Sequence, residues 1–315
     1  MSVLKDIDII CVGEAIVDFL GHEHDHTLLE TSDYKRYLGG SPTNVAMNCA
    51  RLGLKVHLAV SVGDDDFGTF MTEGLEENNI NIDMVQRVKG VPTSVIFISR
   101  TDKTPHFLPY RTADCHVTED QIPDEVLKRT KIYHTTCFAL SRDIARTTIL
   151  NKAKIAFENG SKISIDLNYS PVVWPDREEA LEVIKKYCKL NPFVKISVDD
   201  MRRLFGDIEV SDMFTFFHKE GVDIVCLTQG SEGVILSKRG QQIINLPAVK
   251  IEKILDATGA GDAFWAGFLY SYLKEYSLEE SLDMALKLAA LKLQNAGHLP
   301  ENSIELLAYF RKKSK

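Results

Sequence analysis

Residues 256–264 read DATGAGDAF, and this stretch is the most informative part of the 315-residue chain. Its two glycines, Gly259 and Gly261, lie in a loop that leads directly into an amphipathic helical pattern. Glycines allow successive backbone N–H groups to converge on one point, and the start of a helix adds partial positive charge. Gly259, Ala260 and Gly261 are therefore predicted to form an anion hole suited to phosphate. Asp262, in the first turn, is expected to be stabilised as a carboxylate by the helix dipole.

The same nine residues have other interpretations when they are taken alone. A glycine-rich turn in which Asp262 merely caps its helix has the same composition. The dinucleotide-binding loop of an oxidoreductase is disfavoured because Phe264 stands where a third glycine is needed, and because the loop lies late in the chain. A Walker loop is excluded, since no Gly-Lys-Ser/Thr follows.

A second glycine-containing segment, Gly-Gly-Ser-Pro-Thr-Asn, occupies residues 39–44. Gly39 and Gly40 permit a ligand to approach the backbone closely, and the amide of Asn44 can both donate and accept hydrogen bonds. Ser41 is predicted to be the N-cap of a helix that has proline at its first position. Taken alone, this segment indicates the start of a helix and nothing more.

Short apolar runs alternate with helical patterns along most of the chain. This alternation is typical of a doubly wound, mostly parallel sheet covered by helices on both faces. The predicted strands are residues 7–13, 56–62, 132–136, 162–166, 194–198 and 223–228. The predicted helices are residues 41–52, 67–78, 144–158, 177–189, 211–219, 262–275 and 278–295.

Two segments interrupt the alternation. Residues 93–100 and 104–111 flank Asp102 and Lys103 in the manner of a β-hairpin, and residues 18–37 are strand-like with no helix. Neither segment fits a (β/α)₈ barrel. We therefore expect one α/β domain over residues 1–315, with a small β-sheet lid formed by about residues 16–38 and 92–112.

The composition narrows the classes of function. The chain has 45 acidic and 37 basic residues, a formal net charge of −8, and no basic face that would indicate nucleic acid or a membrane surface. No apolar run approaches the roughly 18 residues of a membrane helix. Asp6 and Asp8 stand where a signal peptide is apolar, and the six scattered cysteines include no CxxC pair. A cytoplasmic location is expected.

Considered together and in order, these motifs resemble those of the ribokinase-like (PfkB) carbohydrate kinases, and the resemblance covers nearly the whole chain. Chance agreement of so many ordered motifs is implausible. The matching segments are Gly13-Glu14-x-x-x-Asp18, Gly39-Gly40-x-x-x-Asn44, Gly63-Asp64-Asp65-x-Phe67-Gly68, Asp166-x-Asn168, Leu227-Thr228-x-Gly230-x-x-Gly233 and Asp256-x-Thr258-Gly259-Ala260-Gly261-Asp262.

The resemblance implies transfer of the γ-phosphoryl group of ATP to a hydroxyl, usually a primary one on a sugar, with Mg²⁺ accompanying ATP. Asp262 matches the catalytic base and residues 259–261 match its anion hole. Many members bind K⁺ beside the loop that contains Asp256 and Thr258. The β appendage matches a lid over the sugar that often also forms a dimer contact, so a homodimer is expected. The implied sugar ligands are Asp18, Gly39, Gly40, Asn44, Arg111 and Asn168, and the implied ATP neighbours are Thr228, Gly230, Gly233 and Asn295.

Two further features bear on the substrate. Residues 109–114, Pro-Tyr-Arg-Thr-Ala-Asp, follow the predicted hairpin and resemble the matching stretch of fructokinases more than that of 2-keto-3-deoxygluconate kinases. Ser170 stands where the family usually has arginine, and the missing cation favours a neutral hexose over a keto acid. Fructose is the expected substrate. 2-Keto-3-deoxygluconate, another sugar or a nucleoside is the alternative, because the fold does not determine the substrate.

Departures from the family pattern leave a second class of function open. Ser197 and Asp200 stand where much of the family has Asn and Glu, although some fructokinases also have Ser. The sequence therefore does not determine how that loop contacts the metal and the phosphate. A sugar- or nucleotide-sensing protein that has lost turnover is the alternative from another class. The intact Asp262 and its glycines argue against a sensor, whereas Ser170 leaves room for one. The sequence does not determine K⁺ dependence or oligomeric state.

Overall fold

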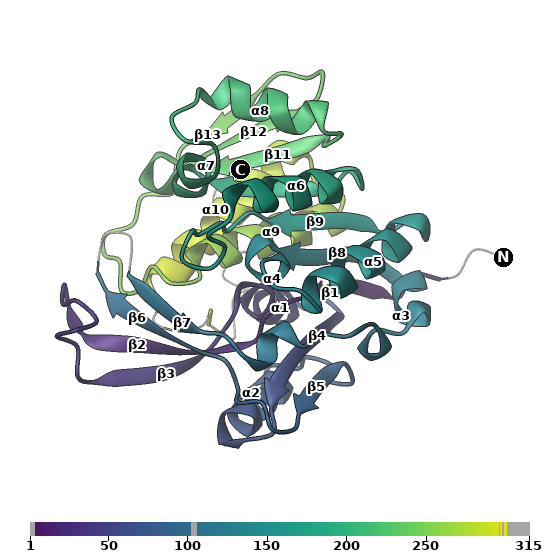
Figure 1. Ribbon diagram of the computed structural model, residues 1–315. Coiled ribbons are helices and arrows are strands. Elements are labelled where there is room, and N and C mark those ends of the chain that lie inside the picture. Colours follow the sequence, from purple (N-terminus) through teal and green to yellow (C-terminus); the bar gives the residue numbers. More distant parts are fainter. Residues whose placement is uncertain (1–3, 102–105, 296, 298, 301–315) are drawn as a thin grey trace.

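The computed structural model describes residues 4–101, 106–295, 297, 299 and 300, and two separate sheets organise them (Figure 1). The larger sheet has nine strands in the order β13-β12-β11-β10-β9-β8-β1-β4-β5. These strands are β1 Ile7–Val12, β4 Val56–Gly63, β5 Val85–Val88, β8 Thr130–Thr136, β9 Lys162–Asp166, β10 Phe193–Ser197, β11 Ile224–Thr228, β12 Val234–Lys238 and β13 Ile244–Leu246.

The six neighbouring strands from β4 to β11 in the large sheet are parallel and buried on both faces, whereas β12 pairs antiparallel with β11 and with β13. β1 pairs in parallel with β4 and β8, and the parallel pairing continues through β9 and β10 to β11. Continuous apolar runs suit such strands, because helices cover both of their faces. The predicted strands agree with β1, β4 and β8–β11 to within two residues. The sequence did not predict β5, β12 and β13; β5 and β13 have four and three residues, too few for a clear periodicity.

Two groups of helices enclose the large sheet and bury one hydrophobic cluster on each face (Figure 1). The first group is α1 Ser41–Arg51, α2 Asp66–Glu77, α9 Ala260–Leu273 and α10 Leu278–Leu293. The second group is α3 Asp124–Lys128, α4 Cys137–Leu140, α5 Ala145–Glu158, α6 Arg177–Cys188, α7 Val198–Phe205 and α8 Val210–Lys219. The predicted doubly wound α/β fold is confirmed, and the predicted helices agree to within two residues.

The smaller sheet has four strands in the order β3-β2-β6-β7 and extends from one end of the large sheet (Figure 1). Its strands are β2 Ile16–His24, β3 Tyr34–Gly39, β6 Val95–Arg100 and β7 Phe107–Tyr110. They lie in the two segments from which the sequence predicts a lid. Residues 102–105, within the predicted hairpin, lie outside the described residues. Closure of this sheet over a sugar remains a prediction.

The start of α1 differs from the expectation. The N-cap is Gly40, with φ of 94°, and Ser41 is already the first helical residue. Gly40 is required there because a Cβ atom would lie 2.3 Å from the carbonyl oxygen of Glu14. The Ser41 hydroxyl, which was predicted to cap the helix, instead donates to Asp262. The helix therefore starts at a glycine, and the Ser41 side chain is free to hydrogen-bond to Asp262 on another helix.

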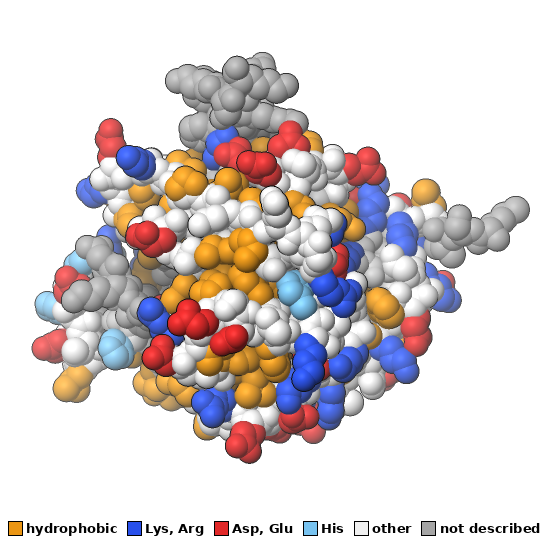
Figure 2. Space-filling model, turned by 90° about the horizontal axis from the view of Figure 1, so that it is seen from above, with side chains coloured by type: hydrophobic (Ala, Val, Ile, Leu, Met, Phe, Trp, Pro, Cys, Tyr) orange, Lys and Arg blue, Asp and Glu red, His pale blue; other side chains and the backbone are white. Residues whose placement is uncertain are grey.

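The described surface carries charges of both signs. Figure 2 shows acidic and basic side chains interspersed over the face that it views. Among the described residues, no helix combines the length and the apolar composition that are needed to cross a lipid bilayer.

Candidate active site

The polar residues singled out from the sequence gather where parallel strands of the large sheet end. The strand order β4-β1-β8 puts β1 inside the sheet, so the strand order reverses beside β1. Open α/β sheets bind ligands in the crevice outside the carboxyl ends of strands at such a point. Glu14 follows β1, and its Oε2 atom accepts a hydrogen bond of 2.8 Å from Thr136 at the end of β8. The two strand ends are thereby tied together.

Glu14 also holds the N-terminus of α1 in place. Its Oε1 atom accepts the N–H of Ser41 at 3.0 Å, and its backbone carbonyl accepts the hydroxyl of Thr43 at 3.0 Å. Burial raises the pKa of Glu14 to about 8, although the hydrogen bond from Thr136 opposes this shift. Glu14 therefore orients the first turn of α1, from which Ser41 and Asn44 project.

Asp262 is held by hydrogen bonds to both of its carboxylate oxygens. Ser41 Oγ donates to Oδ1 at 2.6 Å, and Asn44 Nδ2 donates to Oδ2 at 2.9 Å. Asp262 lies in the first turn of α9, whose N-cap is Gly259 in the left-handed conformation, with φ of 73°. The first turn of a helix presents backbone N–H groups that have no intrahelical partner. The two predicted motifs thus form one site, with the carboxylate beside the start of the helix.

The sequence-based expectation for the charge of Asp262 is wrong in direction. Burial raises the pKa of Asp262, and the Lys195 ammonium and the hydrogen bonds from Ser41 and Asn44 offset this only in part. Asp262 is 9 % exposed. The helix dipole was expected to make it a weak base, but removing a carboxylate from water has a larger effect than the dipole. The residue is therefore a stronger base than predicted.

A buried ion pair lies against the loop that is predicted to form the anion hole. Lys195, on β10, and Asp166, at the end of β9, are 2.7 Å apart, with side chains 7 % and 1 % exposed. A Cβ atom at Gly261 would lie 2.9 Å from Lys195 Nζ, so glycine leaves room for the ammonium beneath the loop. Asp166 Oδ1 has no hydrogen-bond partner among the described residues, and burial raises the pKa of Asp166 to about 7. A cation thus lies where the phosphate is predicted to bind.

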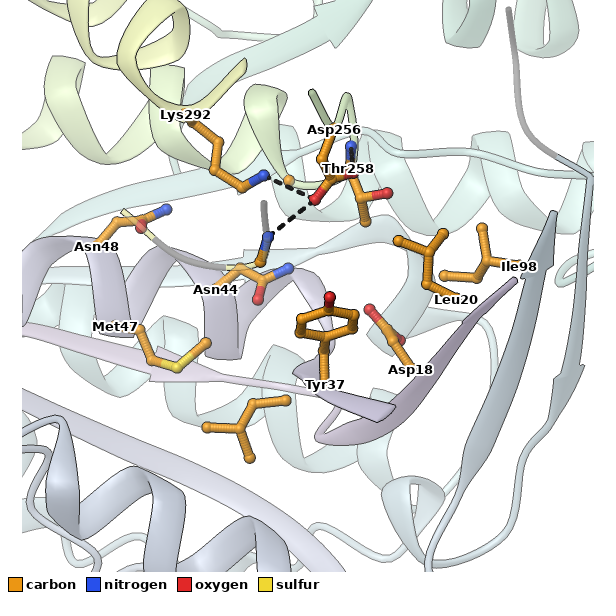
Figure 3. Close-up of a pocket in the computed structure, with 13 residues that line it drawn as sticks. Asp18, Leu20, Tyr37, Asn44, Met47, Asn48, Ile98, Asp256, Thr258 and Lys292 are labelled. Carbon is orange, nitrogen blue, oxygen red and sulfur yellow. Dashed lines mark hydrogen bonds and ion pairs between the residues drawn. The ribbon is translucent and has the colours of Figure 1, made fainter. Parts of the chain in front are cut away.

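A cleft of about 470 Å³ opens between the small sheet and the start of α9 (Figure 3). The small sheet contributes Asp18, Leu20, Tyr37 and Ile98, and the Tyr37 hydroxyl points into the cleft. Polar and apolar groups on opposing elements are typical of a small-molecule site. The remaining lining residues are Leu38, Asn44, Met47, Asn48, Asp256, Thr258, Gly259, Lys292 and Gly297.

Asp18 is half-buried in this cleft, and its position explains one of the predicted glycines. A Cβ atom at Gly39 would lie 2.2 Å from the Asp18 carboxylate, so only glycine lets the carboxylate lie over β3. Burial raises the pKa of Asp18 to about 8, and the nearby carboxylates of Asp262 and Asp256 add to this effect. The Asp18 carboxyl group thus lies in the cleft beside the two other carboxylates, and its contact with a sugar remains a prediction.

Arg111 and Asn168 have partners within the protein. The guanidinium of Arg111 is 5 % exposed, contacts Asp114 Oδ2 through Nη2 at 2.6 Å and through Nε at 2.8 Å, and also donates to Ser141. It lies over the ring of Phe138, with 4.2 Å to the ring centroid. Asn168 Oδ1 accepts the N–H of Phe138 at 3.0 Å. Neither residue lines the cleft described above, so a role in sugar binding remains a prediction for both.

The predicted ATP-binding residues lie at the same edge of the sheet or next to it. Thr228 ends β11 and pairs with Ser197 at the end of β10. Gly230 and Gly233 have positive φ, and a Cβ atom at Gly233 would lie 2.1 Å from the carbonyl oxygen of Leu246. Asn295 follows α10, and its Nδ2 donates to the carbonyl of Leu291 at 2.7 Å. Contact of these residues with ATP remains a prediction.

The Asp256 carboxylate, beside which the resemblance implies K⁺, already has a cationic partner. Lys292 Nζ lies 3.1 Å from Asp256 Oδ2, and the N–H groups of Thr258 and Gly297 donate to Oδ1 and Oδ2 at 2.9 and 3.1 Å. Burial acts to raise the pKa of Asp256, but the Lys292 ammonium and these two N–H groups lower it below its ordinary value. The carboxylate is therefore ionised and fully engaged by this chain.

Two departures from the family pattern have local structural explanations. Ser197 and Asp200 form a capping box at the start of α7, in which each side chain bonds the backbone N–H of the other residue. Ser170 Oγ accepts the N–H of Val172 at 3.3 Å within a tight turn. Neither contact places a cation where the family usually has arginine at the position of Ser170.

Four functional candidates were missed or given no role from the sequence: Ser41, Asp166, Lys195 and Lys292. A charged residue within the apolar run Phe-Val-Lys-Ile-Ser is unusual for a buried strand and could have identified Lys195. Lys292 had no such signal, because a lysine near the end of a helix is common.

Comparison with known proteins agrees with this geometry. The pfkB family carbohydrate kinase model matches residues 6–303. The ATP-dependent 6-phosphofructokinase of Thermoanaerobacterium thermosaccharolyticum is 32% identical over 297 residues, which cover 93% of this chain and 90% of that protein. The 5-dehydro-2-deoxygluconokinase of Listeria innocua is 27% identical over 295 residues, which cover 91% and 90%. The solved structure of Halothermothrix orenii fructokinase matches with a TM-score of 0.80 and 35% identity, covering 90% of this chain and 98% of that one.

These matches confirm the resemblance on which the expectations of fold and activity rested. The family model spans nearly the whole described chain, and both relatives and the solved structure carry the names of sugar kinases. The chain therefore belongs to the pfkB family of carbohydrate kinases, as a phosphotransferase that uses ATP and acts on a sugar hydroxyl.

Proposed function

We propose that the acceptor is a free, uncharged hexose and that fructose is the preferred one. The observation that carries this proposal is the charge of the cleft. Asp18 and Asp256 line it, and Asp262 lies next to it, whereas Lys292 is its only cation among the described lining residues and is paired with Asp256. A sugar phosphate or a keto acid needs an available cation to bind its negative charge, and the described lining of this cleft offers these carboxyl groups but no such cation. A neutral sugar would instead donate its hydroxyls to them.

Arg111 supports the same choice. A substrate carboxylate needs a cation that is available to it, and the guanidinium of Arg111 is engaged by Asp114 and Ser141. The resemblance of residues 109–114 to fructokinases favours fructose among the neutral sugars. In this proposal Arg111 supports the wall of the site, whereas Asp18 and Asn44 bind sugar hydroxyls directly.

The chemical step needs a positioned hydroxyl and a stabilised phosphoryl group. Asp262 would accept the proton of the attacking hydroxyl as the oxygen–phosphorus bond forms and the bond to the ADP oxygen breaks. Lys195 and the N–H of Gly261 would bind the phosphoryl oxygens, where charge is greatest in the transition state. Ala260 N–H, which donates to Ala257 at 3.3 Å, would exchange that contact for a phosphoryl oxygen.

Mg²⁺ would accompany ATP and neutralise part of the phosphate charge. Mg²⁺ is usually held by the phosphates, water and one or two carboxylates. Asp166 fits this role, because its buried Oδ1 atom has no hydrogen-bond partner among the described residues. The nucleotide itself would lie toward Thr228, Gly230, Gly233 and Asn295.

A substrate screen at fixed Mg-ATP tests the proposal. The panel is fructose, fructose 6-phosphate, 5-dehydro-2-deoxygluconate, 2-keto-3-deoxygluconate, ribose and adenosine, with ADP release as the readout. We expect the highest kcat/KM for fructose. A higher value for fructose 6-phosphate or for either keto acid would contradict the proposal, and sugar binding by calorimetry without ADP release would indicate a sensor.

We also propose that the small sheet forms a homodimer contact. The face of this sheet that lies away from the cleft carries Phe19, Phe97, Leu108 and Tyr110, and the last two side chains are 45 % and 55 % exposed. Phe19 and Phe97 stack at 5.1 Å between ring centroids. An exposed apolar face of this kind favours burial against a second copy. Light scattering after gel filtration is expected to give twice the 35.4 kDa chain mass, and Leu108→Glu is expected to give the monomer mass.

We infer a cytoplasmic location from the proposed substrate. ATP and Mg²⁺ are available there, and the six cysteines are all unpaired and mostly buried, as in a reducing compartment. Fractionation of cells with an antibody against this chain tests the location.

A further inference from the structure

The ammonium group of Lys292 is buried beside the loop that begins the anion hole. Lys292 lies in the last turn of α10, and its side chain is 4 % exposed. Its Nζ atom lies 3.1 Å from Asp256 Oδ2 and donates to the backbone carbonyl of Asn295 at 3.3 Å. Figure 3 shows the side chain reaching from α10 to the Asp256 carboxylate. A carboxylate oxygen and a main-chain carbonyl thus share one monovalent cation that belongs to this chain.

A potassium ion does not fit at this place while Lys292 occupies it. K⁺ would need oxygen ligands of the same kind. Asp256 Oδ2 and the carbonyl oxygen of Asn295 are already bound to the Lys292 ammonium. Two positive charges a few ångströms apart in a buried site repel each other strongly. The described residues therefore disagree with the potassium ion that the resemblance implies beside Asp256 and Thr258.

The position of Lys292 connects the end of α10 to the anion hole. Leu255 N donates to the Leu293 carbonyl at 2.8 Å, so the loop before the anion hole is tied to the same helix end. A Cβ atom at Gly259, the N-cap of α9, would lie 3.8 Å from Lys292 Cε. Asp256 lies between Leu255 and Gly259 in the chain, and its Oδ1 atom accepts the N–H of Thr258. The cation thus fixes the loop from which the amides of the anion hole project.

We propose that the Lys292 ammonium replaces the monovalent cation of this loop, so that the enzyme does not depend on K⁺. Lys292 is a positioning residue, because it acts through Asp256 and the loop and not on the reacting atoms. The inference rests on the proposed role of residues 259–261 as the phosphate site. It predicts that removing the ammonium creates a place that K⁺ can fill.

The first test measures phosphoryl transfer in KCl and in tetramethylammonium chloride at equal ionic strength. The wild-type enzyme is expected to have the same kcat in both salts. Lys292→Ala is expected to lose about tenfold or more in tetramethylammonium chloride, because a buried carboxylate loses its partner, and to regain most of that loss in KCl. Lys287→Ala, which removes the pair with Asp283 on the same helix, is the matched control and is expected to respond to neither salt.

The second test measures melting temperature and needs no turnover. An ion that binds only the folded state raises the melting temperature with its concentration. A rise specific to KCl is expected for Lys292→Ala and not for the wild type or Lys287→Ala. Lys292→Met, which keeps more of the side-chain volume, serves if the alanine variant does not fold.

Two results would overturn the proposal: K⁺-specific activation or stabilisation of the wild type, and the absence of any K⁺-specific response in both Lys292 variants. If the wild type phosphorylates none of the sugars in either salt, the proposed substrate fails. The melting-temperature series still decides the role of Lys292 in that case.

Discussion

Ser41 Oγ donates a hydrogen bond of 2.6 Å to Asp262 Oδ1, although the two residues are 221 positions apart in the chain. The contact joins the first turn of α1 to the first turn of α9, and Asn44 adds a second hydrogen bond from the same helix. Both bonds favour the ionised carboxylate, against the opposing effect of burial. The charge state of the proposed base therefore depends on a helix that the N-terminal motif begins.

Asp262→Asn is expected to lower kcat by about 10²–10⁴-fold, the usual contribution of a general base. The loose transition state of phosphoryl transfer demands little deprotonation, so positioning and charge stabilisation would account for the remaining rate. The KM for ATP should stay nearly unchanged, because Asp262 is not expected to contact the nucleotide. Steady-state kinetics with saturating sugar measure both quantities. Turnover equal to that of the wild type would remove Asp262 from the mechanism.

Ser41→Ala is expected to shift the acid limb of the kcat–pH profile upward by about one to two units, because a hydrogen bond to a charged group is worth about 1.5–3 kcal/mol and one pKa unit is worth about 1.4 kcal/mol. The sign follows from the loss of a bond that lowers the pKa of Asp262. A full pH profile measures the shift. Ser41→Thr keeps the hydroxyl and should retain the wild-type limb. An unchanged limb in the alanine variant would show that Ser41 does not tune the base.

Sugar affinity is expected to rise with pH until about pH 8. The pKa of Asp18 is raised to about 8, so its carboxyl group is mostly protonated below that pH, and sugar hydroxyls donate best to the ionised form. Sugar binding should therefore release a proton near neutral pH, and calorimetry in buffers of different ionisation enthalpy measures that release. Asp18→Asn should abolish it. Asp33→Asn, which changes an exposed side chain in the β2–β3 connection, is the control and should leave the proton release unchanged. Proton release that persists in Asp18→Asn would show that another group releases the proton.

Lys195→Met is expected to lower both stability and kcat. Breaking a buried ion pair costs about 3–5 kcal/mol, because the buried carboxyl group of Asp166 loses its partner. Loss of the cation beneath the anion hole should reduce kcat by about 10²-fold or more. Adding Asp166→Asn removes the orphaned carboxyl group and should restore much of the melting temperature, while kcat stays low because both the cation and the proposed Mg²⁺ ligand are absent. Recovery of kcat in the double variant would show that Lys195 has only a structural role.

Much of the fold could be read from the sequence because local patterns determine it. The apolar runs of β1, β4 and β8–β11 and the periodic patterns of the longer helices predicted the architecture, since each element must bury an apolar face. The two glycine-containing segments were equally recognisable, because Gly40 and Gly259 adopt positive φ, and Gly39 and Gly261 leave room for the side chains of Asp18 and Lys195. Strands as short as β13 were not predicted, since their pairing depends on the neighbouring strand more than on their own residues.

Tertiary structure alone determined the partners of each charged group. Nothing local to Asp262 indicates that Ser41 and Asn44 reach it, or that burial outweighs the helix dipole and raises its pKa. Lys195 and Lys292 are ordinary lysines in the sequence, and they matter because the fold buries each one against a carboxylate at the site. The local sequence predicted which two glycine-containing segments meet at the candidate site, because the backbone conformations that need glycine are a local property. Pairing, burial and protonation depend on residues that come together only when the chain folds.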